Sequence, residues 1–287
     1  MFHIVVRRTP RTWDAVLGLV QRHDLPLITS ENRPDDVAPQ DWCKYVLARR
    51  HATGRDVADD VIGALTGDDQ AAMAMIDELA GGRDLLPKIA DAARRLRAER
   101  PGLRGRWGAF VSGGPRTAYT SLNPASAPAI DELLRAGATL TLELYPRYSD
   151  YCASATTVSG RDEWMADFFQ GESGAFPQPR LRWLAGRRRE LRSRSRLTVL
   201  FPTTDVDPVD YLGRAEPDVF LDRMFHVWAT RSAFRGLMLA DNGGIGTYKW
   251  DEKVTDPARD ARFVESWNHY CRDGATTTLR GRPRCGS

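Results

Sequence analysis

Several short apolar runs in this chain end on an acidic or polar residue. The clearest is Ala71–Leu79, where small and apolar residues lead into two adjacent carboxylates, Asp77 and Glu78. A buried strand of a parallel sheet has this appearance, because both of its faces are covered and polar residues are tolerated at its ends. The pattern recurs in three later segments: Thr139–Tyr145, Leu197–Asp205 and Gly236–Asp241. We therefore expect one site built from the ends of several strands.

The alternation of strand and helix patterns runs through the whole chain. The predicted strands are 2–7, 25–30, 44–48, 71–77, 105–111, 138–145, 197–202 and 236–241, with 275–279 as the alternative to 44–48. The predicted helices are 12–22, 84–99, 126–136, 161–170, 180–194, 216–234 and 257–271. Such alternation is typical of α/β proteins with a parallel sheet.

About eight strand–helix units in 287 residues predict a (β/α)8 TIM barrel. We expect one domain over residues 1–287, with an enlarged loop and helix region at 146–196. An open doubly wound sheet is the competing fold. The first strand–helix junction lacks the GxGxxG phosphate loop that many such sheets carry, which favours the barrel.

Composition and charge exclude some classes of partner. The hydrophobic fraction of 42% and the net charge of +3 are ordinary for a globular protein, and no run of 18 apolar residues predicts a membrane span. The arginine-rich stretch Arg180–Arg196 is interrupted by Leu181, Leu184 and Leu191, so we interpret it as a solvated helix and predict no nucleic-acid partner. An arginine-lined pocket for a phosphate or carboxylate remains the alternative.

The cysteines give no metal motif. Cys43, Cys152, Cys271 and Cys285 have neither CxxC nor another zinc spacing. Cys271 and Cys285 could close a C-terminal loop if the protein is exported. The N-terminus lacks the basic and long apolar regions of a signal peptide, so the chain as given predicts a cytoplasmic protein, or an extracellular one if a leader has been removed.

The strand ends collect carboxylates and amides but no histidine. The predicted strand-end residues are Glu31, Asn32, Asp77, Glu78, Ser112, Glu143, Tyr145, Asp205, Asp207, Asp241 and Asn242. A hydrolytic zinc site is disfavoured, because zinc normally takes histidine or cysteine, whereas carboxylate-held magnesium stays open. In Thr139–Tyr145 the leucines share one face and Glu143 and Tyr145 the other, so we expect these two at the mouth of the barrel.

Each carboxylate also has an ordinary structural explanation. Glu143 could neutralise Arg147, and Asp77 or Glu78 could cap the following helix. Asp241 precedes an Asn-Gly turn signal, and Asp205 lies in a loop before Asp207-Pro.

A barrel with acidic strand ends, loop aromatics and no metal histidines resembles the (β/α)8 glycoside hydrolases. In many of them the general acid closes the fourth strand, which corresponds here to Ile76-Asp77-Glu78 if 44–48 is the third. The resemblance implies that Glu78 is the general acid and Glu143 the partner carboxylate, with Asp77 and Asp241 assisting. It further implies a carbohydrate substrate bound by Glu31, Trp107, Tyr145, Asp205 and Asn242, and no cofactor or metal.

Two alternatives to a glycosidase remain open from the residues. The chain could be a catalytically silent barrel that binds carbohydrate or a partner protein. It could also be a barrel lyase or aldolase that uses magnesium held by carboxylates.

Overall fold

The structure is a computed structural model. It describes residues 2–5, 14, 17–18, 21–22, 26–29, 32–68, 70–77, 85–112, 127–170, 181–202, 216–230, 245–249 and 257–285. The predicted strand 236–241 lies outside these residues.

The strands are short, run parallel and pair in chain order. They are β1 (Phe2–Val5), β2 (Leu27–Thr29), β3 (Trp42–Leu47), β4 (Met73–Asp77), β5 (Trp107–Ser112), β6 (Thr139–Glu143), β7 (Leu197–Pro202) and β8 (Ile245–Lys249). β1 also pairs with β8 in parallel. Because every pair is parallel, all carboxyl ends of the strands lie at one edge of the sheet. This edge is where the sequence predicts the site.

The prediction of a closed, eight-stranded (β/α)8 TIM barrel is wrong. The sheet is a six-stranded, all-parallel half-barrel, β2 to β7, to which β1 and β8 add only short stretches of backbone pairing. The helical layer is irregular as well. Between β2 and β3, the described residues 32–41 contain bends and a 3₁₀ turn at Pro39–Asp41 but no α-helix. Pro34 and Pro39 suit such a turn, because proline lacks the N–H that a helix interior needs.

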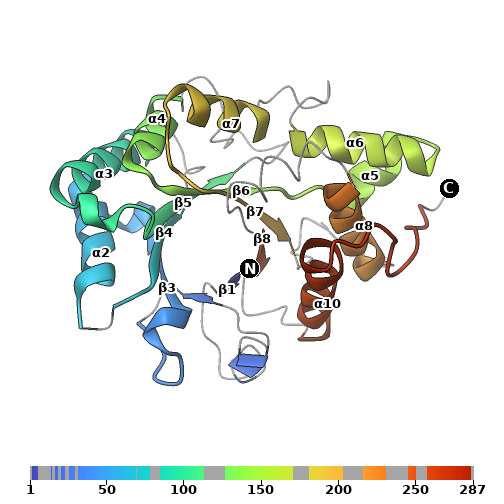
Figure 1. The fold of residues 1–287 in the computed structure, drawn as a ribbon, viewed down its shortest axis with the longest axis horizontal. Coiled ribbons are helices and arrows are strands. Elements are labelled where there is room, and N and C mark those ends of the chain that lie inside the picture. The colour runs from blue at the N-terminus through green and yellow to red at the C-terminus, as the bar shows by residue number, and fades with distance from the viewer. Residues whose placement is uncertain are drawn as a thin grey trace.

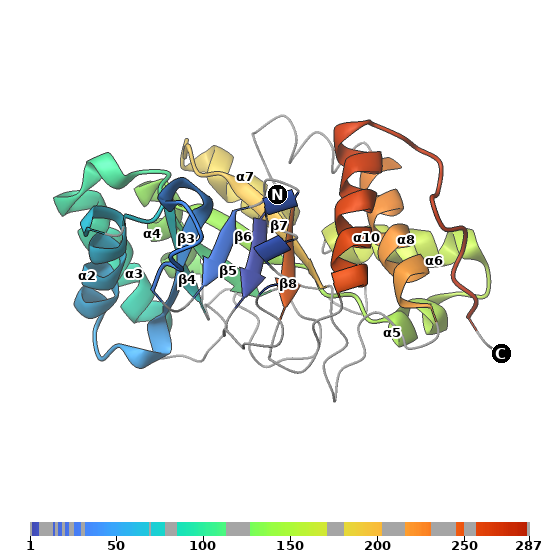
Figure 2. The ribbon, with the colours of Figure 1, turned by 90° about the horizontal axis from the view of Figure 1, so that it is seen from below.

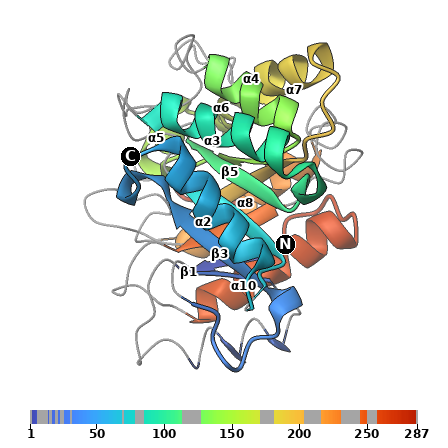
Figure 3. The ribbon, with the colours of Figure 1, turned by 90° about the vertical axis from the view of Figure 1, so that its left-hand side faces the viewer.

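Eight α-helices occur among the described residues. They are α2 (Gly54–Thr66), α3 (Leu85–Glu99), α4 (Ala127–Ala136), α5 (Tyr148–Ser154), α6 (Val158–Gln170), α7 (Leu181–Glu190), α8 (Pro217–Thr230) and α10 (Pro257–Trp267). Figures 1 and 3 show α2, α3 and α4 next to one another along one side of the sheet. Figure 2 shows α5, α6, α8 and α10 grouped on the other side. The predicted enlarged region 146–196 contains α5, α6 and α7.

Two clusters of buried side chains lie on the two faces of the sheet, one on the side of the helices and one on the inner side. Outward-facing strand residues such as Ile76, Leu142 and Val199 pack with the helices in the larger cluster. The smaller cluster lies on the other face of the strands and consists of Ile28, Cys43, Tyr45, Leu47, Met75, Phe110 and Leu200. We call this face of the strands the inner face. The leucines of β6 lie on the helix side, as the alternation in the sequence predicts.

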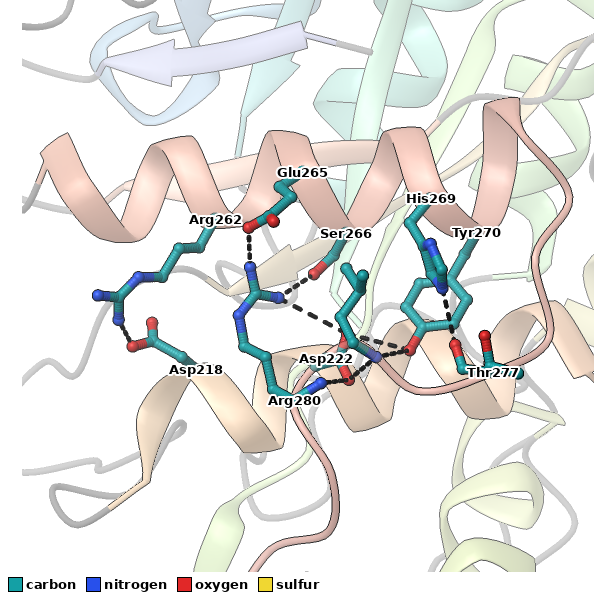
Figure 4. Close-up of polar contacts among 10 residues, drawn as sticks. Asp218, Asp222, Arg262, Glu265, Ser266, His269, Tyr270, Thr277 and Arg280 are labelled. Atoms are coloured by element: carbon teal, nitrogen blue, oxygen red, sulfur yellow. Dashed lines mark hydrogen bonds and ion pairs between the residues drawn. The ribbon is translucent and has the colours of Figure 1, made fainter.

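The C-terminal segment is fastened to α8 and α5. The fully buried Asp222 of α8 accepts hydrogen bonds from the Tyr270 hydroxyl at 3.0 Å and from the backbone N–H groups of Leu279 and Arg280 at 3.2 Å (Figure 4). Residues 275–279 therefore belong to an irregular C-terminal segment, residues 273–285, which we call the strap. The alternative strand predicted at 275–279 is wrong. Buried carboxylates need this degree of hydrogen bonding, because an unpaired charge in the interior is costly.

A disulfide joins Cys152 of α5 to Cys285 at the end of the strap, 133 residues later. The pairing of Cys271 with Cys285 considered from the sequence is therefore wrong, and the half-buried Cys271 lies outside the disulfide. A cross-link over such a long loop removes much conformational freedom from the unfolded chain.

We predict that Cys152→Ser lowers the free energy of unfolding by about 2–5 kcal/mol, since a native disulfide typically contributes this much. Chemical denaturation of the oxidised protein measures the effect. Cys271→Ser is the matched control, because it removes a thiol without removing a cross-link. Equal stability of the two variants would show that the Cys152–Cys285 bond does not form.

A second prediction concerns pH and His226 of α8. Burial lowers the pKa of His226, and the positive charges of Arg223 and Arg282 add to this, against the opposing effect of Asp162 and Asp222. The folded protein therefore binds a proton at His226 less readily than the unfolded chain. Stability should fall as the pH drops from the ordinary histidine pKa, near 6.5, through the lower folded value. Thermal midpoints of wild type and His226→Gln between pH 7.5 and 5 test this, and the variant should lose the smaller amount of stability.

Candidate functional site

The structure describes four of the nine predicted site residues. Asp77, Trp107, Glu143 and Tyr145 lie within the described ranges. The other five lie outside them: Glu31, Glu78, Asp205, Asp241 and Asn242. The candidate site is therefore built from the first four and their neighbours.

Asp77 is the last residue of β4 and pairs in register with Leu47 at the end of β3. It shares a strand face with Met73 and Met75, which belong to or pack against the inner cluster. Its exposed fraction is only 9%. The aspartate therefore lies at the carboxyl edge of the sheet, at the end of an apolar interior.

Glu143 is the last residue of β6 and lies in register with Ser112 of β5 and Leu200 of β7. It is half-buried. It shares the inner face with Thr141, whose hydroxyl lies 2.5 Å from that of Thr198, and with Tyr145, which packs against the inner cluster. The expectation that Glu143 and Tyr145 lie on the same face, away from the leucines, is met.

The strand register and the spacing between strands give the distance between the Cα atoms of Asp77 and Glu143. Ile76 pairs with Ala109, and Ala109 pairs with Leu140, so Asp77 lies level with Thr141 and Glu143 lies two residues further along. Two strand spacings of about 4.8 Å and a rise of about 3.3 Å per residue place the two Cα atoms about 12 Å apart. Both residues alternate along their strands with helix-facing residues, so both belong to the inner face of the sheet.

The apolar floor below the carboxylates contains one thiol. The rings of Tyr45 and Phe110 lie 5.5 Å apart between centroids, beside Met75 and Cys43. Burial raises the pKa of the Cys43 thiol to about 12. A thiol that stays protonated is a poor nucleophile, so Cys43 is not a candidate for covalent catalysis.

Trp107 is not brought together with the carboxylates. It is the first residue of β5, at the amino edge of the sheet, and is 1% exposed within the helix-facing cluster. Its side chain therefore lies on the opposite face from Asp77 and Glu143, at the other end of the strands. The prediction from the sequence treated it as a residue of the site without assigning it a strand face.

Sequence reasoning missed Thr198 and Tyr45, which line the same inner face as the carboxylates. The signal was present in the alternation of β7, where Leu197, Val199 and Phe201 face the helices and Thr198 and Leu200 face inward. The contact between the hydroxyl groups of Thr141 and Thr198 could not be predicted from the sequence, because it joins residues 57 positions apart.

Within the described part of the chain, no group of three His, Cys, Asp or Glu side chains is placed to hold a metal ion. No described helix is long and apolar enough to cross a membrane. No protein-family model and no curated protein matches the chain. The described residues place two carboxyl groups, those of Asp77 and Glu143, at the carboxyl edge of the sheet. Carboxyl groups in such a position can act as general acid and general base.

We predict that Cys43 is unreactive in the folded protein. At pH 8 its alkylation by iodoacetamide should be on the order of a thousandfold slower than that of an ordinary exposed thiol, because little of it ionises. Cys271 serves as the internal control, since it lies outside the disulfide and is less buried than Cys43. Peptide mapping by mass spectrometry measures both, and rapid labelling of Cys43 would contradict its burial.

Proposed function

We propose that this protein is a glycoside hydrolase or a closely related carbohydrate-active enzyme that uses paired carboxylates at the carboxyl edge of its parallel sheet. The observation that supports it is the shared inner face of Asp77 and Glu143, two strands apart at the ends of β4 and β6. Ligands of α/β proteins commonly bind outside the carboxyl ends of the strands. The proposal does not require a regular TIM barrel.

Glycoside cleavage needs one carboxylic acid to protonate the leaving oxygen and one carboxylate to attack the sugar or activate water. In this proposal Glu143 is the nucleophile or base. The acid comes from the adjacent pair Asp77-Glu78, with Glu78 as the predicted donor and Asp77 assisting. Asp241 also assists catalysis. Tyr145 contacts the substrate from the inner face, and Glu31, Asp205 and Asn242 complete the binding residues.

The stereochemical outcome of the proposed reaction depends on the separation of the two carboxyl groups. Inverting enzymes hold them about 6.5–9.5 Å apart to leave room for water, and retaining enzymes hold them about 5–5.5 Å apart. The anomeric configuration of the product therefore reports whether the acid and Glu143 leave room for a water molecule between them.

The first experiment is a screen of nitrophenyl glycosides and polysaccharides with and without a chelator. Chelator-resistant hydrolysis is the expected result. Activity lost on chelation would favour a magnesium lyase or aldolase, and sugar binding without turnover would favour a silent binding protein. Proton NMR of the first product formed distinguishes inversion from retention.

We predict that Glu143→Gln folds normally and loses most of its turnover, by a factor of about 100 or more. The change keeps the volume and the hydrogen-bonding capacity of the side chain but removes the charge that nucleophilic or base chemistry needs. Turnover and the thermal midpoint are measured on the same preparation.

The matched control is Glu163→Gln, which makes the same change at an exposed position on α6. If Glu143 only balances a buried arginine, its replacement should instead destabilise the protein by about 3–5 kcal/mol. A Glu143→Gln protein with full activity would remove Glu143 from the catalytic machinery.

A further inference from the structure

A pocket of about 110 Å³ lies at the amino edge of the sheet, the end opposite to Asp77 and Glu143. Trp107 forms part of its wall, and half of its lining residues are arginines: Arg97, Arg100, Arg104 and Arg135. No acidic residue lines it. A hollow of this size has room for several water molecules or for one small polyatomic ion.

The chain folds locally so that these arginines converge. Arg97 lies in the last turn of α3, and Arg135 in the last turn of α4. The 3₁₀ turn Pro101–Leu103 then reverses the chain between Arg100 and Arg104, with the Arg104 N–H donating to the Pro101 carbonyl at 3.3 Å. The two helices pack side by side, which brings their C-terminal ends together (Figure 1).

Gly137 leaves space for the side chain of Arg104. It has a φ of +73°, and a Cβ at this position would clash with the Nε and Cγ atoms of Arg104. The side chain of Arg104 therefore crosses the backbone of Gly137 in space that another residue would fill. This position puts its guanidinium next to the end of α4 and beside Arg135.

The obvious structural role for such arginines is to cap the carbonyl groups at helix C-termini. At α4 that role is already filled. The N–H groups of Gly137 and Ala138 donate to the carbonyls of Leu134 and Leu133, both at 3.1 Å, and the Ser193 hydroxyl donates to Leu134 at 2.5 Å. The carbonyls of Leu133 and Leu134 therefore do not depend on an arginine as donor.

The charge around the pocket is not balanced by the protein. Glu132 is shared between Arg135, at 2.8 Å, and Arg97, at 3.3 Å. Among the residues that the structure describes, Arg100 and Arg104 have no ion pair. The four arginines are exposed, so solvent screens part of their mutual repulsion, and an anion in the pocket would relieve the rest.

We propose that this pocket binds a tetrahedral oxyanion, phosphate or sulfate, either free or carried by a sugar. The planar guanidinium group pairs with such anions through two parallel N–H···O bonds, which is why arginine recurs in phosphate sites. The site is separate from the carboxylate edge and does not depend on the glycosidase proposal.

The test is titration calorimetry with sodium phosphate and sodium sulfate at constant ionic strength adjusted with sodium chloride. Wild type should bind one ion per chain, and Arg104→Gln should weaken binding about tenfold or more, because a charge-assisted hydrogen bond is lost. Arg189→Gln is the matched control, since it removes the same charge from an exposed position on α7 outside the pocket. The thermal midpoints of both variants show that they fold.

The outcomes separate specific binding from general electrostatics. Equal weakening by Arg104→Gln and Arg189→Gln, or complete competition by chloride at matched ionic strength, would overturn the proposal. So would the absence of binding by wild type. A hexose 6-phosphate that binds more tightly than inorganic phosphate would identify a sugar phosphate as the source of the anion, and equal affinities would identify the free ion.

Discussion

The parallel backbone ladder is the constraint on which the rest of this structure depends. Neighbouring strands from β1 to β8 are hydrogen-bonded in the same direction, so every strand delivers its C-terminal residue to the same edge. The period of two then decides which side chain faces inward. A one-residue shift of β4 would exchange Asp77 for Ile76 on the inner face and move a carboxylate into the helix-facing core. The candidate site is thus fixed by register as much as by residue type.

Much of the fold could be predicted because burial on both faces leaves a direct record in the sequence. Seven of the predicted strands overlap β1 to β7, and the segment 44–48 was correctly preferred over 275–279. Helix α2 was missed, although Thr53 and Asp56 form a reciprocal capping box at its start. The sequence does not predict strand β8, because Ile245–Lys249 contains a glycine, a threonine and a lysine. The more apolar segment 236–241 has the stronger strand pattern.

The irregular parts could not be predicted, because they depend on contacts between distant residues. The described residues 32–41 between β2 and β3 contain no α-helix, which breaks the repeat that a (β/α)8 barrel requires. Their prolines alone do not predict this break. The Cys152–Cys285 pairing and the Asp222 network join residues far apart in the chain. For the site, Glu143 and Tyr145 could be assigned a face because β6 alternates cleanly. Trp107 could not, because its strand is apolar on both faces.

The two edges of the sheet hold their charged groups in different surroundings. At the carboxyl edge, Asp77 and Glu143 adjoin the apolar inner cluster and are buried or half-buried. At the amino edge, four exposed arginines converge beside the end of α4, where backbone and serine groups already donate to the carbonyls of Leu133 and Leu134. Solvent screens the repulsion among exposed arginines, so the fold can hold them together without a counter-ion. The two proposals therefore differ in chemistry: a sugar would bind against half-buried carboxylates, and an oxyanion against exposed guanidinium groups.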